Sequence, residues 1–370
     1  MPVMDIPRLF LKFLFCCIAI ILPGFRSQAQ INIEGKIDKI ITQSMSEEGF
    51  PGMEVAVVQH GKVVFKKAYG IKSEDSNEKT DENTIFSIGS VSKAFTGLGV
   101  MLLVQNGKIT LDDPIKKYMK DLPEAWGNIT IRQYMTHTSG IPELKGKKDD
   151  GSFEGTVKST GNLPMSFSPP GKKQQYNNFN FAIMGKLIEQ VTGMAYLDYM
   201  DKYIFHPLQM TRTGVLPDAP NIAMGHMLRN GKWKVIKTHF RPGDYGVSSG
   251  GLQTTLTDFI KLSQALSGTT LLNKATEEKM WTPYSQRLSN TPGWHSRTGS
   301  NGIIIHKGGG GTGIGCVCDY KIVPSQDLYV VVMANKDNNK ISPADITADI
   351  LQQCYNIADN GKDSGDGEGN

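Results

Sequence analysis

Strand-like segments lie at both ends of this chain, and mainly helical patterns lie between them. The segment EVAVVQHGKVVFKKAYG (54–70) alternates apolar and polar residues around a His-Gly pair, which is typical of a hairpin. Three later segments, GIIIHK (302–307), GIGCVCDYKIV (313–323) and LYVVVMANK (328–336), have the spacing of an antiparallel meander. This order predicts an α+β fold: an antiparallel sheet flanked by helices, formed from both chain ends, with an inserted, mainly helical region.

The first 29 residues have the pattern of a secretory signal. Arg8 and Lys12 flank the start of the apolar run FLFCCIAIILPG, and Ser27 and Ala29 fit the two small-residue positions before a cut at Gln30. A membrane anchor is the alternative, but the apolar run is shorter than the roughly 20 residues that a spanning helix needs. We therefore expect a signal peptide at 1–29, secretion to the periplasm, and no stable membrane span after cleavage.

The rest of the chain is predicted to form one domain and a short tail. Residues 30–358 are expected to form the domain, with an α/β part at about 30–110 and 243–358 and a helical part at about 111–242. Residues 359–370 lack apolar side chains and are expected to be disordered.

Composition excludes several classes of function. The net charge of +4 is small for 370 residues, and no stripe of Lys and Arg is interleaved with aromatics, so nucleic acid is not an expected partner. The seven histidines are scattered without H-x-H or H-E-x-x-H spacing, and Cys316, Cys318 and Cys354 include no C-x-x-C pair. We expect no metal and no cofactor, and we expect Cys316 and Cys318 to be buried thiols.

A Ser-x-x-Lys pair, Ser90 and Lys93, opens the long apolar segment SVSKAFTGLGVMLLVQ. The same spacing at Ser76 and Lys79 falls in a polar loop, so the spacing alone decides nothing. Apolar residues at helical intervals predict a buried helix that begins near Ser90. Residues three apart share a helix face, and the first turn offers unpaired N–H groups and partial positive charge, which favour an oxyanion. Ser90 is therefore the candidate nucleophile.

A second motif, GVSSG at 246–250, fits the G-x-S-x-G pattern of a nucleophile elbow. That elbow needs a strand before the serine and a helix directly after it. Here HFRPGDYG precedes the motif, and GLQTT separates it from the next helical pattern. We therefore predict that this segment is a tight glycine turn beside the site and that Ser248 is not the nucleophile.

Two further segments can complete a site around Ser90. Tyr176-Asn177-Asn178 opens the helical pattern FNFAIMGKLIEQV, and the first meander strand continues into IIIHKGGGGTGIG (303–315). With Ser90 and Lys93 they resemble the motifs of the serine β-lactamase and penicillin-binding-protein superfamily, and within it the class C β-lactamase-like branch. THTSGIP, whose His137 is expected to be structural, and VVVMANK extend the resemblance over nearly the whole chain after the signal.

The resemblance implies a role for each residue of this set. Ser90 attacks the carbonyl carbon of the substrate. Lys93 and Tyr176 share the tasks of taking the serine proton and passing it to the leaving group, and Asn178 orients Lys93 and the substrate amide. The N–H groups of Ser90 and Gly310 form the oxyanion hole, in which a single donor is typically worth ~3 kcal/mol.

The strand motif can be aligned in two registers. With Lys307-Gly308-Gly309 as the family's K-T-G, the later glycines align without a gap, and Lys307 supplies positive potential for Tyr176 and for a substrate carboxylate. With His306-Lys307-Gly308, the strand matches the H-x-G of many relatives. We prefer the first register. In both, the middle threonine, which in the family helps to hold the carboxylate of β-lactams and D-alanyl peptides, is absent. Its absence disfavours antibiotics and favours esters or peptides, whereas the H-K-x-G context favours β-lactams. The residues expected to line the substrate side of the strand are His306, Gly308 and Gly309.

The resemblance implies a secreted serine hydrolase that forms an acyl-enzyme on Ser90 and hydrolyses a β-lactam, a D-amino-acid peptide or an ester. One alternative is a carboxylesterase or D-alanyl carboxypeptidase without useful β-lactamase activity. Another is a non-catalytic sensor or peptidoglycan-binding module on the same fold, which the complete set of Ser90, Lys93, Tyr176 and Asn178 disfavours. We expect a small-molecule or peptidoglycan-derived substrate, no cofactor, and a monomer.

Overall fold

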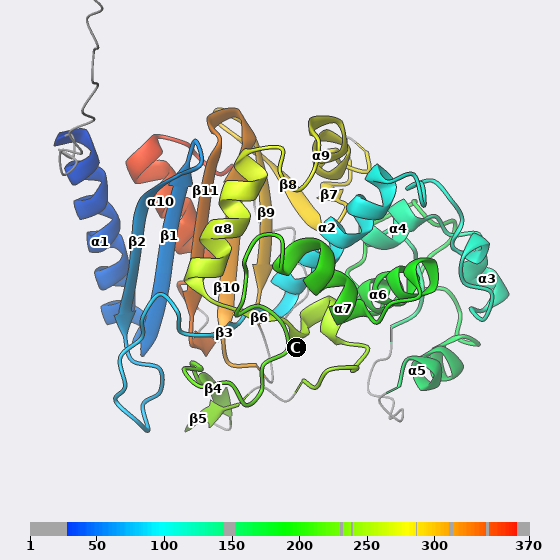
Figure 1. Ribbon diagram of the computed structural model, residues 1–370, viewed down its shortest axis with the longest axis horizontal. Helices are drawn as coiled ribbons and strands as arrows, with labels where there is room; N and C mark the ends of the chain where they lie inside the picture. The colour runs from blue at the N-terminus through cyan, green and yellow to red at the C-terminus, as the bar shows by residue number, and fades with distance from the viewer. Residues whose placement is uncertain are drawn as a thin grey trace, which may run out of the picture.

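The centre of the molecule is a seven-stranded antiparallel sheet in the order β2-β1-β11-β10-β9-β8-β7. The computed structural model describes residues 28–143, 152–229, 232–237, 240–285, 287–310, 314–337 and 340–360. Figure 1 shows the sheet at one end of the molecule and most of the shorter helices at the other. The strand order confirms the predicted α+β fold, with a sheet built from both ends of the chain.

An N-terminal hairpin and a C-terminal meander meet in the middle of this sheet. β1 (Gly52–Gln59) pairs with β2 (Lys62–Gly70) on one side and with β11 (Leu328–Ala334) on the other. β10 (Val317–Val323) joins β11 to β9 (Gly302–Gly309), as the spacing of these segments predicts. The other strands are β3 (Phe86–Ser87), β4 (Gly225–Arg229), β5 (Lys232–Ile236), β6 (Gln253–Thr254), β7 (Asn290–Thr291), β8 (Trp294–Gly299) and β12 (Lys336–Asp337).

Helices cover both faces of the sheet. α1 (Gln28–Glu48) and α10 (Pro343–Tyr355) pack on one face, where their isoleucines join the valines of β11 in one core. α8 (Leu256–Ser267) lies on the other face, in a second core that continues into the helical region. The other helices are α2 (Ser92–Gln105), α3 (Glu124–Gly127), α4 (Ile131–Met135), α5 (Phe153–Thr160), α6 (Phe179–Thr192), α7 (Tyr196–Met200) and α9 (Lys274–Trp281).

α2 connects the sheet to the helical region and is buried from Ser92 to Leu103. A helix that is apolar on every side is stable only when other elements surround it. The ring of Phe95 shows this, because it packs 6.0 Å from Phe205 in the helical region and 5.9 Å from Phe259 on α8. The start of α2 is therefore fixed from several directions.

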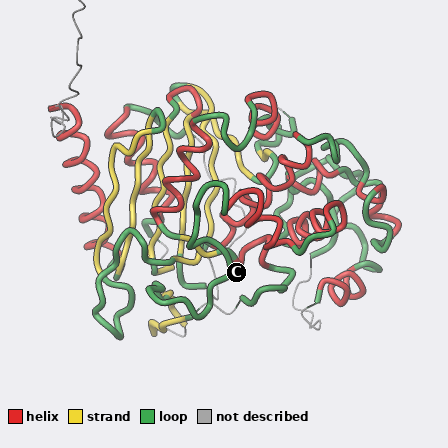
Figure 2. Tube along the Cα trace, viewed as in Figure 1, coloured by secondary structure: helices red, strands yellow, loops and turns green. Residues whose placement is uncertain are grey.

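Figure 2 shows that helices and loops dominate the half of the molecule away from the sheet. The region at 111–242 also contains the β4–β5 hairpin, which pairs with β12 and which the sequence pattern does not predict. Leu228 and Trp233 face each other across this hairpin and keep 51% and 41% exposure. An apolar pair on the solvent side removes the alternation by which a half-buried strand is identified.

Both ends of the described chain differ in detail from expectation. α1 was not predicted from the sequence, although it buries Ile37 and Ile41 at helical spacing. Asp359, assigned to the tail, forms an ion pair with Arg297 (3.2 Å), and the N–H of Asn360 donates to Thr298 O (3.3 Å). The predicted signal segment lies outside the described residues up to position 27, and so does the tail from 361.

Two smaller expectations concern membranes and thiols. Across the described residues, no helix is both long enough and apolar enough to span a membrane. Cys316 and Cys318 are buried free cysteines at the start of β10, as predicted. Burial raises the pKa of the Cys316 thiol to about 12, so this thiol stays protonated and unreactive at neutral pH.

Candidate active site

A sharp turn holds Ser90 at the start of α2. Gly89 has a φ of +49°, a conformation that glycine adopts without strain, and Gly89–Val91 form a single 3-10 turn ahead of the helix. Ser92 fixes this turn, because its Oγ donates to Gly89 O (2.7 Å) and accepts from the N–H of Leu252 (3.0 Å). Ser90 is thus placed where backbone N–H groups point out of the helix end.

Ser90 Oγ lies between two proton-carrying groups. It is 2.6 Å from the phenolic oxygen of Tyr176, and Lys93 Nζ donates to it at 2.9 Å. Because Ser90 Oγ accepts from Lys93, its own proton can point to Tyr176. Ser90 keeps 7% exposure, whereas Lys93 is fully buried. This arrangement is suited to activating a serine hydroxyl for attack on a carbonyl carbon.

Lys93 is held by oxygen acceptors from separate parts of the chain. Besides Ser90 Oγ, its ammonium donates to Asn178 Oδ1 (2.7 Å) and to the carbonyl oxygen of Ser249 (2.6 Å). A buried charge requires such partners, because removing it from water is otherwise costly. Asn178 stands at the start of α6, and Ser249 belongs to a π-helical turn at Val247–Gly251. The predicted glycine turn beside the site is therefore present, and it contributes a backbone oxygen.

Tyr176 lies on the loop ahead of α6 and is oriented by its neighbours. The ring of His137 packs against it with centroids 4.6 Å apart, and His137 Nδ1 accepts from the N–H of Asn177 at 3.3 Å. The ammonium groups of Lys93 and Lys307 lie 4.8 and 5.4 Å from the centre of the tyrosine ring. Two positive charges this close favour negative charge on the tyrosine oxygen.

β9 contacts the start of α2 through its glycines. A β-carbon added at Gly309 would lie 2.6 Å from Ser90 N, and one added at Gly89 would lie 2.6 Å from Gly310 N. This close approach brings the backbone of Gly310 beside that of Ser90, as an oxyanion hole made from both requires. Lys307, two residues before Gly309, shares its face of the strand.

The opposite face of β9 carries His306 and Gly308. His306 Nε2 lies 2.6 Å from Asp319 Oδ1 on β10, and a β-carbon added at Gly308 would lie 3.5 Å from the same oxygen. Burial lowers the pKa of His306, although Asp319 opposes this. Burial alone would raise the pKa of Asp319, but Lys321 and His306 hold it well below its usual range. Lys307 and Gly309 therefore lie on the face of β9 toward Ser90, whereas His306 and Gly308, which we expected to line the substrate side, lie on the other face beside Asp319.

Sequence patterns gave no indication of two residues that support Lys307. Lys307 Nζ lies 3.0 Å from His295 Nε2 on β8, and His295 Nδ1 hydrogen-bonds Asn290 Oδ1 on β7. Neither residue belongs to a recognisable motif, and the only available signal is their place in a short strand-like stretch, NTPGWHSRTG. In the part of the chain that the structure describes, no three His, Cys, Asp or Glu side chains cluster as metal ligands do.

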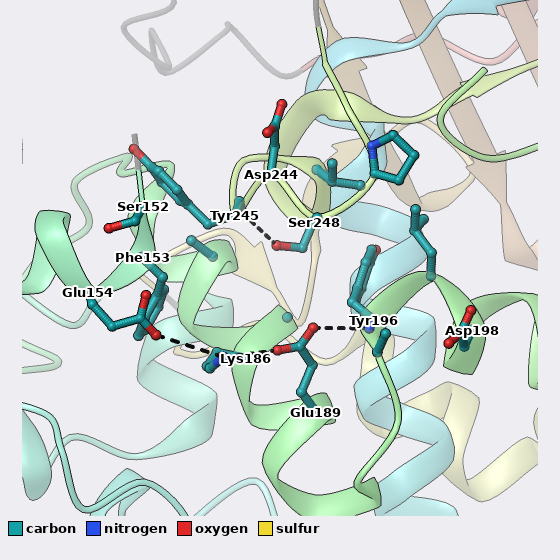
Figure 3. A pocket seen from close by; sticks show the side chains of 17 residues that line it. Ser152, Phe153, Glu154, Lys186, Glu189, Tyr196, Asp198, Asp244, Tyr245 and Ser248 are labelled. Carbon is teal, nitrogen blue, oxygen red and sulfur yellow. Dashed lines mark hydrogen bonds and ion pairs between the residues drawn. The ribbon is translucent and has the colours of Figure 1, made fainter. Parts of the chain in front are cut away.

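A separate pocket of about 510 Å³ lies beside α6 (Figure 3). It is lined by α6, the starts of α5 and α7, and residues 242–245, 247 and 248, and Lys186 pairs there with Glu189 (3.2 Å). Ser248 stands on its wall and donates its Oγ to the carbonyl oxygen of Phe181 (2.9 Å). The lining residues do not include Ser90, so this pocket is distinct from the serine cluster.

Comparison with known proteins identifies relatives over most of the chain. A family model described as Beta-lactamase matches residues 37–353. Protein flp of Staphylococcus aureus (strain N315) is 30% identical over 226 residues, which cover 56% of this chain and 44% of that protein. Teichoic acid D-alanine hydrolase of Staphylococcus aureus is 31% identical over 233 residues, covering 61% of this chain and 56% of that protein. The chain thus spans about half the length of these relatives.

A solved structure extends the likeness to three dimensions. The crystal structure of FmtA from Staphylococcus aureus superposes with a TM-score of 0.74 at 26% sequence identity, covering 90% of this chain and 93% of that one. The likeness includes the sheet, the flanking helices and the helical region together, because it covers nearly the whole of both chains.

Proposed function

The chain belongs to the Beta-lactamase family of serine hydrolases, and on this basis we propose that it works through an acyl-enzyme on Ser90. The observation that carries the proposal is the position of Ser90 Oγ, 2.6 Å from Tyr176 and 2.9 Å from Lys93 at the start of a buried helix. A sensor or binding module on the same fold would gain nothing from a buried ammonium directed at a serine hydroxyl.

In the acylation step, Ser90 Oγ forms a bond to the substrate carbonyl carbon while its proton passes to the phenolate oxygen of Tyr176. The carbonyl oxygen becomes an oxyanion next to the N–H groups of Ser90 and Gly310. As the tetrahedral intermediate collapses, the bond to the leaving group breaks, and Tyr176 returns the proton to that group. Lys93 stays positively charged throughout and stabilises the negative charge that moves between Ser90 and Tyr176.

In the deacylation step, water takes the place of the leaving group. Tyr176 accepts a proton from this water, and the resulting hydroxide attacks the acyl carbon. The bond to Ser90 Oγ then breaks, and the proton returns to the serine. Asn178 takes part by holding Lys93, so that the same proton path serves both steps.

We propose that the substrate is a D-alanyl ester or peptide and that β-lactams are turned over poorly. A relative named teichoic acid D-alanine hydrolase supports this class. The family's middle threonine, which helps to hold the carboxylate of β-lactams, is replaced here by Gly308. A side chain at this position would point to Asp319, so an anionic substrate group depends on Lys307.

We also propose that the enzyme is exported, with cleavage before Gln30. The signal-like residues at 1–29 support this, because a substrate in the cell envelope can be reached only from outside the cytoplasm. Mass spectrometry of the mature N-terminus from the native host tests this proposal, since an uncleaved Met1 would contradict it.

A panel of substrates tests the proposed activity. The purified protein is incubated with a fluorescent penicillin, a chromogenic cephalosporin, a p-nitrophenyl ester and a D-alanyl ester. We expect hydrolysis of both esters, slow turnover of the cephalosporin, and no activity on any of them in Ser90→Ala. Fast cephalosporin turnover would overturn the substrate class, and equal activity in Ser90→Ala would overturn the acyl-enzyme.

A further inference from the structure

Lys307 is held by a chain of contacts that fixes the hydrogen positions of each member. Asn290 Nδ2 donates to the carbonyl oxygen of Thr136 at 3.0 Å, so the amide oxygen Oδ1 is the atom that faces His295. An amide oxygen only accepts, and His295 Nδ1 must therefore carry the proton of that hydrogen bond. Neutral His295 then presents a bare Nε2 to Lys307 Nζ, 3.0 Å away.

Both members of this pair are buried, so water cannot easily replace their contact. Lys307 keeps 2% exposure and His295 keeps 6%. An ammonium in such a place needs acceptors, and the lone pair on Nε2 supplies one without bringing a negative charge into the site. A carboxylate in place of His295 would neutralise Lys307 and compete with an anionic substrate, whereas a neutral imidazole leaves the full positive charge available.

We propose that His295 is a positioning residue that holds the Lys307 ammonium beside Tyr176, ready for a negatively charged substrate group, and that it does so only as the neutral Nδ1–H tautomer. The proposal rests on the proposed function, in which Lys307 serves the anionic part of the substrate. Protonation of Nε2 would remove the acceptor and direct an N–H at the ammonium. Loss of this acceptor should therefore weaken recognition of anionic substrates more than that of neutral ones.

Other titratable groups lie close to the pair of His295 and Lys307. His306 on β9 packs against His295 with ring centroids 6.0 Å apart, and Tyr176 lies beyond Lys307. His306 hydrogen-bonds Asp319 on the face of β9 that points away from Ser90. A variant that alters His295 alone is needed to separate its contribution from that of these neighbours.

The chain offers a matched pair of substitutions for this purpose. In His295→Gln, the side-chain amide can donate to Asn290 and accept from Lys307, as the neutral imidazole does, but it does not titrate. In His295→Leu, a side chain of similar volume has no acceptor. Each variant is assayed with a 3-carboxyphenyl ester and with its uncharged 3-carbamoylphenyl analogue, and Lys307→Ala serves as the reference for complete loss of the subsite.

We expect His295→Leu to lower kcat/KM for the carboxylate ester by about tenfold, mostly through KM, and to lower that for the uncharged ester by a clearly smaller factor. His295→Gln should retain the wild-type preference for the carboxylate ester, because its amide oxygen can still accept from Lys307. Turnover of the uncharged ester shows that each variant is folded.

The outcomes separate this inference from the function on which it rests. If Lys307→Ala loses the preference for the carboxylate ester and His295→Leu keeps it, the role of His295 is overturned and the subsite stands. If Lys307→Ala keeps the preference, the subsite itself is overturned. A preference that is lost in His295→Gln as fully as in His295→Leu would also overturn the inference, because an acceptor at this place would then not suffice to hold Lys307.

Discussion

A β-carbon on Gly309 would lie 2.6 Å from the backbone nitrogen of Ser90, a separation that real β-carbons do not show. It would also lie 2.2 Å from the carbonyl oxygen of Ile88. β9 can therefore approach the start of α2 only because residue 309 has no side chain. At the neighbouring Gly308, a β-carbon would meet its nearest atom at 3.5 Å, an ordinary contact.

This difference predicts opposite results for two similar substitutions. Gly309→Ala should move β9 away from Ser90 and misplace the Gly310 N–H, lowering kcat/KM for an ester by at least about 100-fold, as loss of an oxyanion donor does. Gly308→Ala adds the same methyl group one residue away and should stay within about threefold of wild type. Equal effects in the two variants would contradict the close contact between Gly309 and Ser90.

The hydrogen bond between Ser90 and Tyr176 predicts the effect of removing one oxygen atom. Tyr176→Phe should lower kcat by at least about 100-fold and change KM much less, because the proton from Ser90 loses its acceptor. The control is Tyr134→Phe, which also removes a buried phenol oxygen, here bonded to Trp126 O at 3.2 Å. Tyr134→Phe should affect thermal stability and leave kcat unchanged, and unchanged turnover in Tyr176→Phe would exclude this residue from the reaction.

The two faces of β9 predict different substrate dependence for adjacent residues. Lys307→Ala should weaken turnover of carboxylate-bearing substrates more than that of neutral esters, since only the former lose an ion pair. His306→Ala should lower both activities modestly and equally, because this side chain bonds Asp319 on the other face. Steady-state kinetics with a penicillin and a neutral ester distinguish them. A selective effect of His306→Ala instead would support the alternative register of the strand motif.

Glu54 on β1 predicts how stability changes with pH. Its carboxyl group is fully buried, and neither oxygen has a hydrogen-bond partner of normal geometry among the described residues. Burial raises its pKa well above the ordinary 4.5, and the backbone N–H of Leu256 opposes this only in part. The folded protein therefore keeps this proton at pH values where the unfolded chain has lost it. This contribution to stability is complete below the unfolded pKa and is lost as pH rises through the folded pKa.

Glu54→Gln should remove this pH dependence, because an amide does not titrate. Melting temperatures between about pH 4 and about pH 8 should show the variant gaining on wild type as pH rises, by about 1.4 kcal/mol for each unit of pKa shift. Glu47→Gln on the exposed side of α1 is the control for the loss of one negative charge. A variant that melts below wild type at the alkaline end would contradict the assignment.

The helix that begins near Ser90 and the approach of Lys93 to Ser90 were predictable because their signals are local. The apolar spacing after Ser90 gives the helix, and the three-residue spacing gives the approach of Lys93. The acceptor that Ser249 provides was not predictable in the same way, because a backbone oxygen 156 positions away has no side-chain signature. The sequence indicated a glycine turn there, but not which atom the turn contributes.

The contact of His295 with Lys307, helix α1 and the β4–β5 hairpin were not predicted from the sequence, each for a different physical reason. The contact between His295 and Lys307 depends on the pairing of β8 with β9, which places His295 opposite His306, and no motif encodes that pairing. α1 has apolar residues at helical spacing, but it follows directly on the signal-like segment and was not predicted. The β4–β5 hairpin exposes an apolar pair, so its pattern resembles neither a buried nor a half-buried strand.

Mapping the covalent adduct tests whether Ser90 is the nucleophile. The protein is treated with a fluorophosphonate probe or a penicillin, digested, and analysed by mass spectrometry beside Ser90→Ala, Ser76→Ala and Ser248→Ala. We expect one adduct, on the peptide that contains Ser90, which is lost only in Ser90→Ala together with all hydrolysis. An adduct on a peptide without Ser90, or hydrolysis that persists in Ser90→Ala, would contradict it.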